Sequence, residues 1–125
     1  MNKYRSSKTI IDGITFDSLL ESRRYSFLKL MQKAGAISEL KLQIPYTIID
    51  KFTDRFGEKY RETKYIADFV YLNKYGNWIV EDSKSLFMRK NPLYRIKKKL
   101  LLSLFPGMAF FEIENPGDTR GIELK

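Results

Sequence analysis

The segment that decides the fold is residues 64–84, with the sequence KYIADFVYLNKYGNWIVEDSK. Residues 64–72 and 78–84 both alternate with the period of two that β-strands have, so Ile66, Asp68 and Val70 are expected on one face. Gly76 lies in the short connection between them, where a hairpin loop requires a positive φ. The segment therefore predicts an antiparallel hairpin closed by the three-residue loop Lys74-Tyr75-Gly76.

The register of this hairpin brings two aspartates together. Positions equally distant from Tyr75 face each other, so Asp68 stands opposite Asp82, with Cβ atoms about 4.5–5.5 Å apart. Two carboxylates this close repel unless positive charge lies between them. Lys84 follows on the same face as Asp82, because the strand period is two. The hairpin predicts a site for a divalent cation beside an ammonium group, which suits phosphodiester hydrolysis. Alternatively, the three side chains form a salt-bridge cluster or face solvent.

The flanking sequence predicts one α/β domain with a mixed sheet over residues 1–125. Residues 17–34 predict a helix that Ser18 can cap and Gly35 can end, and Asn91-Pro92 predicts the start of a second helix over residues 92–105. Strands are expected at residues 37–49, where Pro45 favours an edge or a bulge, and at 108–113. Residues 50–60 predict a turn or hairpin tip. Residues 1–12 are expected to be a flexible basic arm that ends in a turn at Asp12-Gly13.

The chain has neither cysteine nor histidine. Disulfides, thiolate metal sites, serine–histidine triads and histidine-bound zinc are therefore excluded. Carboxylate oxygens favour hard cations, so Mg²⁺ or Mn²⁺ is the expected cofactor. No apolar run approaches the roughly 18 residues of a membrane helix, and the N-terminus lacks the apolar stretch of a signal peptide. We therefore expect a cytoplasmic protein that has no membrane partner.

Positive charge is concentrated in the second half of the chain. The net charge is +8, and residues 83–111 contain no acidic residue. This distribution suits a polyanion such as DNA, although an anionic membrane surface or a merely solubilising face would also fit. The apolar stripe expected to face the sheet from the second helix is Leu93, Ile96, Leu100, Leu101 and Leu104. The basic side chains expected to contact DNA are Arg89, Lys90, Arg95, Lys97, Lys98 and Lys99.

The hairpin motif resembles that of the PD-(D/E)xK nuclease superfamily. It reads Ile66-Ala67-Asp68-Phe69-Val70-Tyr71, then a loop, then Val80-Glu81-Asp82-Ser83-Lys84. The superfamily's aspartate matches Asp68, its second acidic residue matches Asp82 and its lysine matches Lys84. Glu21 matches the acidic residue that is usual on a preceding helix. Two positions depart from the pattern, since Ala67 replaces the proline and Ser85 stands where a glycine is expected.

The wider pattern resembles a phage family of small endonucleases related to junction-resolving enzymes, through Ala34-Gly35-Ala36-Ile37, Leu40-Lys41-Leu42-Gln43 and the basic helix. The resemblance implies a restriction-endonuclease-like core, a central mixed sheet with a helix on each side, and magnesium-dependent DNA cleavage in a bacterial host. The implied catalytic residues are Glu21, Asp68, Asp82 and Lys84, with the metal held by Asp68, Asp82 and Glu21. The suggested substrate is branched DNA, including Holliday junctions in phage recombination or replication. Symmetric cutting of two strands implies a homodimer.

Several interpretations stay open. Ser18-Leu19-Leu20-Glu21 fits a capping box, in which Glu21 reaches back to the Ser18 backbone N–H instead of a metal. Glu81 points away from Asp82 in a regular strand, and Gln43 either lines the site or is a polar edge residue. The alternative functions are a DNA-binding accessory protein that keeps the nuclease fold without cutting, and a membrane-surface or partner-binding protein that uses the basic helix.

Overall fold

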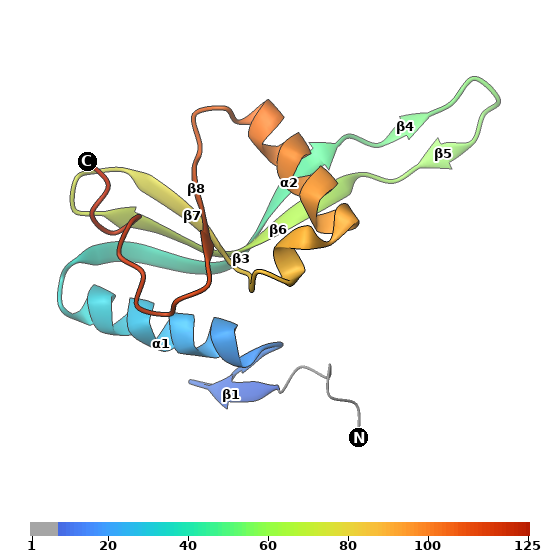
Figure 1. The fold of residues 1–125 in the computed structure, drawn as a ribbon. Helices are drawn as coiled ribbons and strands as arrows, with labels where there is room; N and C mark the ends of the chain where they lie inside the picture. Colours follow the sequence, from blue (N-terminus) through green and yellow to red (C-terminus); the bar gives the residue numbers. More distant parts are fainter. Residues whose placement is uncertain (1–7) are drawn as a thin grey trace.

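A four-stranded mixed sheet forms the centre of the molecule in the computed structural model, which describes residues 8–125 (Figure 1). Its strand order is β3-β6-β7-β8. The strands span Ile37–Ile49, Thr63–Asn73, Trp78–Ser83 and Ala109–Ile113, respectively. β3 and β7 both pair antiparallel with β6, whereas β8 pairs parallel with β7. The expected mixed sheet is confirmed, and β3 with its Pro45 is an edge strand.

The hairpin of β6 and β7 has the predicted register. Val70 pairs with Val80 and Leu72 with Trp78, each pair equally distant from Tyr75. The loop is Lys74-Tyr75-Gly76, and Gly76 has a φ of 84°. A backbone hydrogen bond closes the loop: the Asn73 N–H donates to the Asn77 carbonyl at 2.9 Å.

One helix covers each face of this sheet (Figure 1). Helix α1, Leu19–Lys33, is capped by Ser18 and packs Tyr25 and Leu28 against Phe69, Tyr71 and Ile79. Helix α2, Pro92–Leu104, is capped by Asn91, follows the short 3-10 helix η1, Met88–Lys90, and packs Leu101 against Ala67 and Val70. No helix within residues 8–125 is long and apolar enough to cross a membrane.

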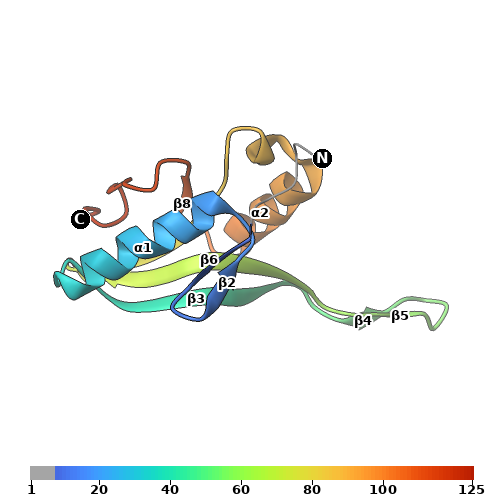
Figure 2. The same cartoon turned by 90° about the horizontal axis from the view of Figure 1, so that it is seen from below.

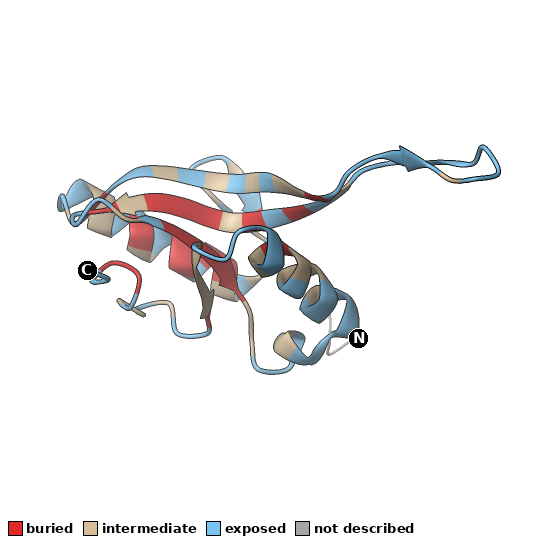
Figure 3. Cartoon of the chain, turned by 90° about the horizontal axis from the view of Figure 1, so that it is seen from above, coloured by how far each residue is buried: buried red, intermediate tan, exposed pale blue. Residues whose placement is uncertain are grey.

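The face of α2 that meets the sheet differs from the prediction. Leu101 is fully buried and Leu100 is half-buried, but Leu93, Ile96 and Leu104 remain exposed. Most of α2 is exposed or half-buried (Figure 3). The helix contacts the sheet through Tyr94 and Leu101, which lie two turns apart on one side. The expected apolar stripe was therefore wrong for three of its five residues.

The N-terminal segment also differs from the prediction. Strands β1, Thr9–Ile11, and β2, Ile14–Phe16, form a hairpin, so a flexible arm is wrong for residues 9–12. The turn at Asp12-Gly13 is confirmed, and both residues have positive φ, as a tight two-residue hairpin turn requires. Phe16 is buried against Tyr25 of α1, which gives the hairpin an apolar attachment. The rest of the expected arm, residues 1–7, lies outside the described residues.

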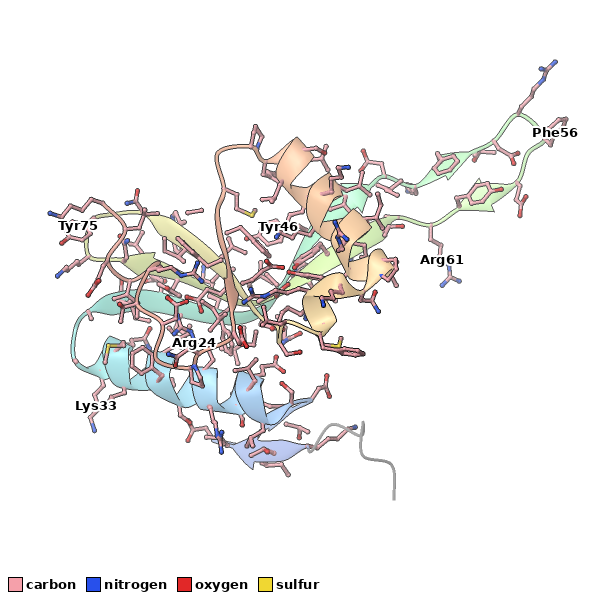
Figure 4. All side chains as sticks on the ribbon, in the orientation of Figure 1. Arg24, Lys33, Tyr46, Phe56, Arg61 and Tyr75 are labelled. Carbon is pink, nitrogen blue, oxygen red and sulfur yellow. The ribbon has the colours of Figure 1, made fainter. Side chains whose placement is uncertain are left out.

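A narrow two-stranded ribbon projects from the body of the protein (Figure 2). It consists of β4, Phe52–Thr53, and β5, Lys59–Tyr60, which confirms the expected hairpin tip at residues 50–60. Phe52 and Tyr60 stack with their ring centroids 4.7 Å apart. Phe56 lies at the tip and is 91% exposed (Figure 4).

Candidate active site

The central sheet reverses its faces at Gln43 of β3. Leu42 packs on the α1 side and Ile44 on the α2 side, although residues two apart share a face in a regular strand. Gln43 lies between them with a φ of 53°, a left-handed conformation that is uncommon outside glycine. This single residue explains the reversal in β3.

The neighbouring strand β6 reverses at the same level. Ala67 packs on the α2 side and Phe69 on the α1 side, with Asp68 between them. The expected common face of Ile66, Asp68 and Val70 was therefore wrong, because Ile66 is 53% exposed whereas Val70 is buried. Asp68 is the residue at which alternate side chains of β6 change from the α2 side of the sheet to the α1 side.

The structure brings Asp68 and Asp82 together across the hairpin. The backbone N–H of Asp68 donates to Oδ1 of Asp82 at 2.9 Å, and the N–H of Ser83 donates to Oδ2 of Asp68 at 2.9 Å. The last residue pair between β6 and β7 is Phe69 with Glu81. Beyond it, the side-chain carboxylates of the two aspartates accept the hydrogen bonds that backbone carbonyls accept in a regular sheet. Each aspartate is thereby held by the neighbouring strand.

Glu21 joins this pair from the first turn of α1. Its side chain is buried, accepts a hydrogen bond from Gln43 Nε2 at 3.0 Å and lies beside Asp68. Burial and the charge of Asp68 raise the pKa of Glu21 to about 7. Only half of the capping box forms here: Ser18 Oγ accepts from the Glu21 N–H at 3.1 Å, while the Glu21 carboxylate turns toward Gln43.

Asp82 is almost completely buried on the other side of the site. Tyr65 Oη donates to its Oδ2, so both carboxylate oxygens have a protein donor. Burial raises the pKa of Asp82 to about 6, against the opposing effects of Lys84 and of the Asp68 N–H. The role of Tyr65 as a hydrogen-bond donor to Asp82 was not predicted from the sequence. The only signal was a tyrosine three residues before Asp68 in the same strand.

Lys84 follows the end of β7 at the edge of the site. Its backbone N–H continues the pairing with β8 by donating to the Ile113 carbonyl at 2.9 Å. Its Nζ lies 5.2 Å from the centre of the Tyr94 ring. Among the described residues Lys84 makes no ion pair within 4.0 Å, so a salt-bridge cluster with the aspartates does not form.

Glu81 is separate from this group. It is fully buried on the α1 side, where Oε1 accepts from Arg24 Nε at 2.8 Å and Oε2 from Tyr71 Oη at 2.6 Å. Arg24 also donates to the carbonyls of Pro116 and Asp118, which ties the C-terminal segment to the core (Figure 4). Glu81 is therefore a structural partner of Arg24.

The donor chemistry of the site fits a hard divalent cation, because the available oxygens belong to Glu21, Asp68, Asp82 and the Gln43 amide. In the present side-chain conformations, however, residues 8–125 contain no group of three or more acidic side chains at metal-binding spacing. Glu21 and Asp68 are neighbours, whereas Asp82 is turned to Tyr65. A shared ion would require the three carboxylates to move closer together than they lie here.

A basic groove of about 720 Å³ lies beside the site, between η1, α2 and β8. Five of the six basic residues expected to contact DNA line it: Arg89, Lys90, Arg95, Lys98 and Lys99. Lys97 is half-buried and does not line it. Glu112, which was not among the predicted site residues, pairs with Lys98 at 3.0 Å and accepts a hydrogen bond from Tyr94 Oη at 2.6 Å. Lys98 is therefore partly neutralised.

Fold and site together define an α/β protein with three largely buried carboxylates at a reversal in its central sheet, next to a basic groove. We call these residues, Glu21, Asp68 and Asp82, the acidic cluster. The chain belongs to the DUF1064 family, which is described as a protein of unknown function and whose sequence model matches residues 1–113. No curated protein and no solved structure matches the chain. The matched residues include every side chain of the acidic cluster and of the basic groove.

Proposed function

We propose that this protein is a metal-dependent endodeoxyribonuclease that hydrolyses phosphodiester bonds in DNA. The observation that carries the proposal is the juxtaposition of Glu21 with Asp68, because burial together with the charge of Asp68 raises the pKa of Glu21 to about 7. A cation bound between two neighbouring carboxylates relieves their mutual repulsion, so this pair is suited to hold one. The likeness of the hairpin motif to that of PD-(D/E)xK nucleases supports the same assignment.

Each polar group has a role in this chemistry. Asp68 and Glu21, joined by Asp82, would hold Mg²⁺ or Mn²⁺, which when bound polarises the phosphate and lowers the pKa of bound water. Lys84 orients the attacking water or stabilises the charge that develops on the phosphate. Tyr65 holds Asp82 through its hydroxyl group, and Gln43 holds Glu21 at 3.0 Å. In the reaction water attacks phosphorus and one P–O bond breaks, which leaves a phosphate on one DNA end and a hydroxyl group on the other.

The basic groove would hold the DNA backbone. Arg95 and Lys99 are exposed and line it, and neither is within 4.0 Å of a carboxylate in the part of the chain that is described. Phosphate contacts of this kind supply affinity without sequence information. Branched DNA such as a Holliday junction, a homodimer that cuts two strands symmetrically, and action in the cytoplasm of a phage host are the finer parts of the proposal.

The test is cleavage of linear, flapped and four-way DNA of matched sequence, with and without Mg²⁺ or Mn²⁺. We expect metal-dependent cleavage by the wild-type protein and none by Asp82→Asn or Lys84→Ala, both of which should still bind DNA. Asp50→Asn removes an exposed carboxylate from the base of the ribbon and should cut normally. Cleavage at the wild-type rate by Asp82→Asn would contradict the assigned site.

A second candidate is a DNA-binding accessory protein that has the nuclease-like fold but does not cut. The observation that favours it is the engagement of both Asp82 oxygens, by Tyr65 and by the Asp68 N–H. Tight DNA binding without cleavage in either metal, on all three DNA forms, would select this function.

A further inference from the structure

Three consecutive apolar side chains project into solvent just after the catalytic candidate Lys84. Leu86 is 58% exposed, Phe87 75% and Met88 44%. We call these three residues the apolar ridge. Contiguous exposed apolar surface on a folded domain commonly marks a binding site.

The ridge is held in a fixed shape. Ser85 accepts two hydrogen bonds, at Oγ from the Met88 N–H at 3.2 Å and at its carbonyl from the Arg89 N–H at 3.1 Å. The Asn91 N–H then donates to the Met88 carbonyl at 3.2 Å, immediately before α2 begins. A turn with this many backbone bonds presents its side chains with little loss of entropy on binding.

The ridge also lies close to the site. Phe87 is the third residue after Lys84, so the distance between their Cα atoms is at most about 11 Å. Successive stacked nucleotides of one strand rise about 3.4 Å along the axis of duplex DNA. A DNA strand whose phosphate lies at Lys84 would therefore place Phe87 within about three nucleotides of the cut.

The charge around the ridge indicates what covers it. The basic groove begins directly after the ridge in the chain, because Arg89 and Lys90 follow Met88 and line the groove together with Arg95 and Lys99. A second copy of the chain docked here by two-fold symmetry would bring these positive charges face to face. DNA offers the opposite charge together with apolar base faces, and proteins that bend DNA insert Phe, Leu or Met between bases.

We infer that the apolar ridge inserts between bases that are already unstacked, next to the scissile phosphate. The substrate class would then be DNA with a branch, flap or other interruption, because unstacking costs least where pairing is already broken. This inference rests on the proposed function for the position of the cut. It adds a physical reason for preferring branched over continuous duplex DNA.

The experiment compares affinities for a four-way junction and a linear duplex of equal length without divalent metal, so that neither is cut. We expect Phe87→Ala to lower the preference for the junction about tenfold, the scale of one lost base–aromatic stack. Phe87→Trp should keep the preference. Phe56→Ala, which removes an even more exposed phenylalanine from the distant ribbon, should leave it unchanged. A 2-aminopurine beside the branch should brighten with wild-type protein and not with Phe87→Ala.

An unchanged junction preference in Phe87→Ala would overturn the inference. So would a result in which Phe87→Ala weakens binding to phosphatidylserine vesicles but not to the junction, because the ridge would then serve a membrane surface. Failure of the proposed function is a separate outcome, in which wild-type protein cuts none of the DNA forms with Mg²⁺ or Mn²⁺. The affinity ratio is measured without metal and does not depend on that result.

Discussion

The protonation of Glu21 provides the most direct physical test of the acidic cluster. Glu21→Gln keeps the size of the side chain and an oxygen that can accept from Gln43, but it removes the ionisable group. The Ser18 cap is also kept, because it uses the backbone N–H of residue 21. Any change in pH dependence or metal response therefore reports on charge and not on packing.

The sign of the pH effect follows from the raised pKa of Glu21. Between pH 4.5 and about 7 the folded protein keeps a proton on Glu21 that the unfolded chain has released. The free energy of unfolding therefore falls as pH rises through this window and levels off above it. The full shift corresponds to about 3 kcal/mol. Water that reaches the half-buried Asp68 screens the pair and reduces this to about 1–2 kcal/mol. Asp82, with its pKa raised to about 6, adds a second contribution of the same sign.

Urea unfolding at pH 5 and pH 8 measures this contribution. We expect Glu21→Gln to be about 1–2 kcal/mol more stable than wild type at pH 8 and to retain only the weaker pH dependence that belongs to Asp82. Mg²⁺ should raise the stability of wild type at pH 8 much more than that of Glu21→Gln, because a ligand stabilises the state that binds it. Glu123→Gln, at an exposed position, is the matched control. If Glu21→Gln matches wild type at pH 8 and gains equally from Mg²⁺, the reasoning is refuted.

Three further predictions test neighbouring parts of the structure. Tyr65→Phe should destabilise the protein by about 1 kcal/mol in urea unfolding and slow cleavage, because Asp82 loses its hydroxyl donor; unchanged values for both would remove Tyr65 from the site. Arg24→Met leaves Glu81 buried without its partner and should cost about 3–5 kcal/mol in the same assay, whereas a loss under 1 kcal/mol would mean that Glu81 becomes protonated or solvated. Arg95→Ala should reduce the slope of log affinity against log salt by about 0.9 for duplex DNA, and an unchanged slope would place the DNA elsewhere.

The parts of the fold that could be predicted are those decided by neighbouring residues. The loop at Lys74-Tyr75-Gly76 and the register of the hairpin follow from one glycine and from strand alternation. The helix starts at Ser18 and Asn91 follow from side chains that cap the backbone a few residues ahead. Such local hydrogen bonds require no knowledge of the rest of the chain.

The exposed side of α2 could not be predicted in the same way. Leucines and isoleucine recur around this helix, so its helical period allows more than one buried face. The structure buries Leu101 beside Tyr94 and leaves Leu93 and Ile96 in solvent. The choice depends on how the helix meets the sheet, which is a tertiary property.

The reversal at Gln43 and Asp68 could not be predicted from the sequence either, because it also depends on tertiary packing. It explains why the carboxylates gather at this place. A left-handed glutamine is unfavourable in an isolated strand, so only its surroundings can maintain it. Before Asp68 in the chain, β6 directs Tyr65 to the α2 side of the sheet, where its hydroxyl group donates to Asp82. After Asp68, the strand packs Phe69 against helix α1, which carries Glu21. Asp68 stands between these two regions and contacts both, through the Ser83 N–H and through its proximity to Glu21. A regular sheet would keep groups from the two layers on opposite faces. The reversal therefore allows carboxylates from both layers to approach one point.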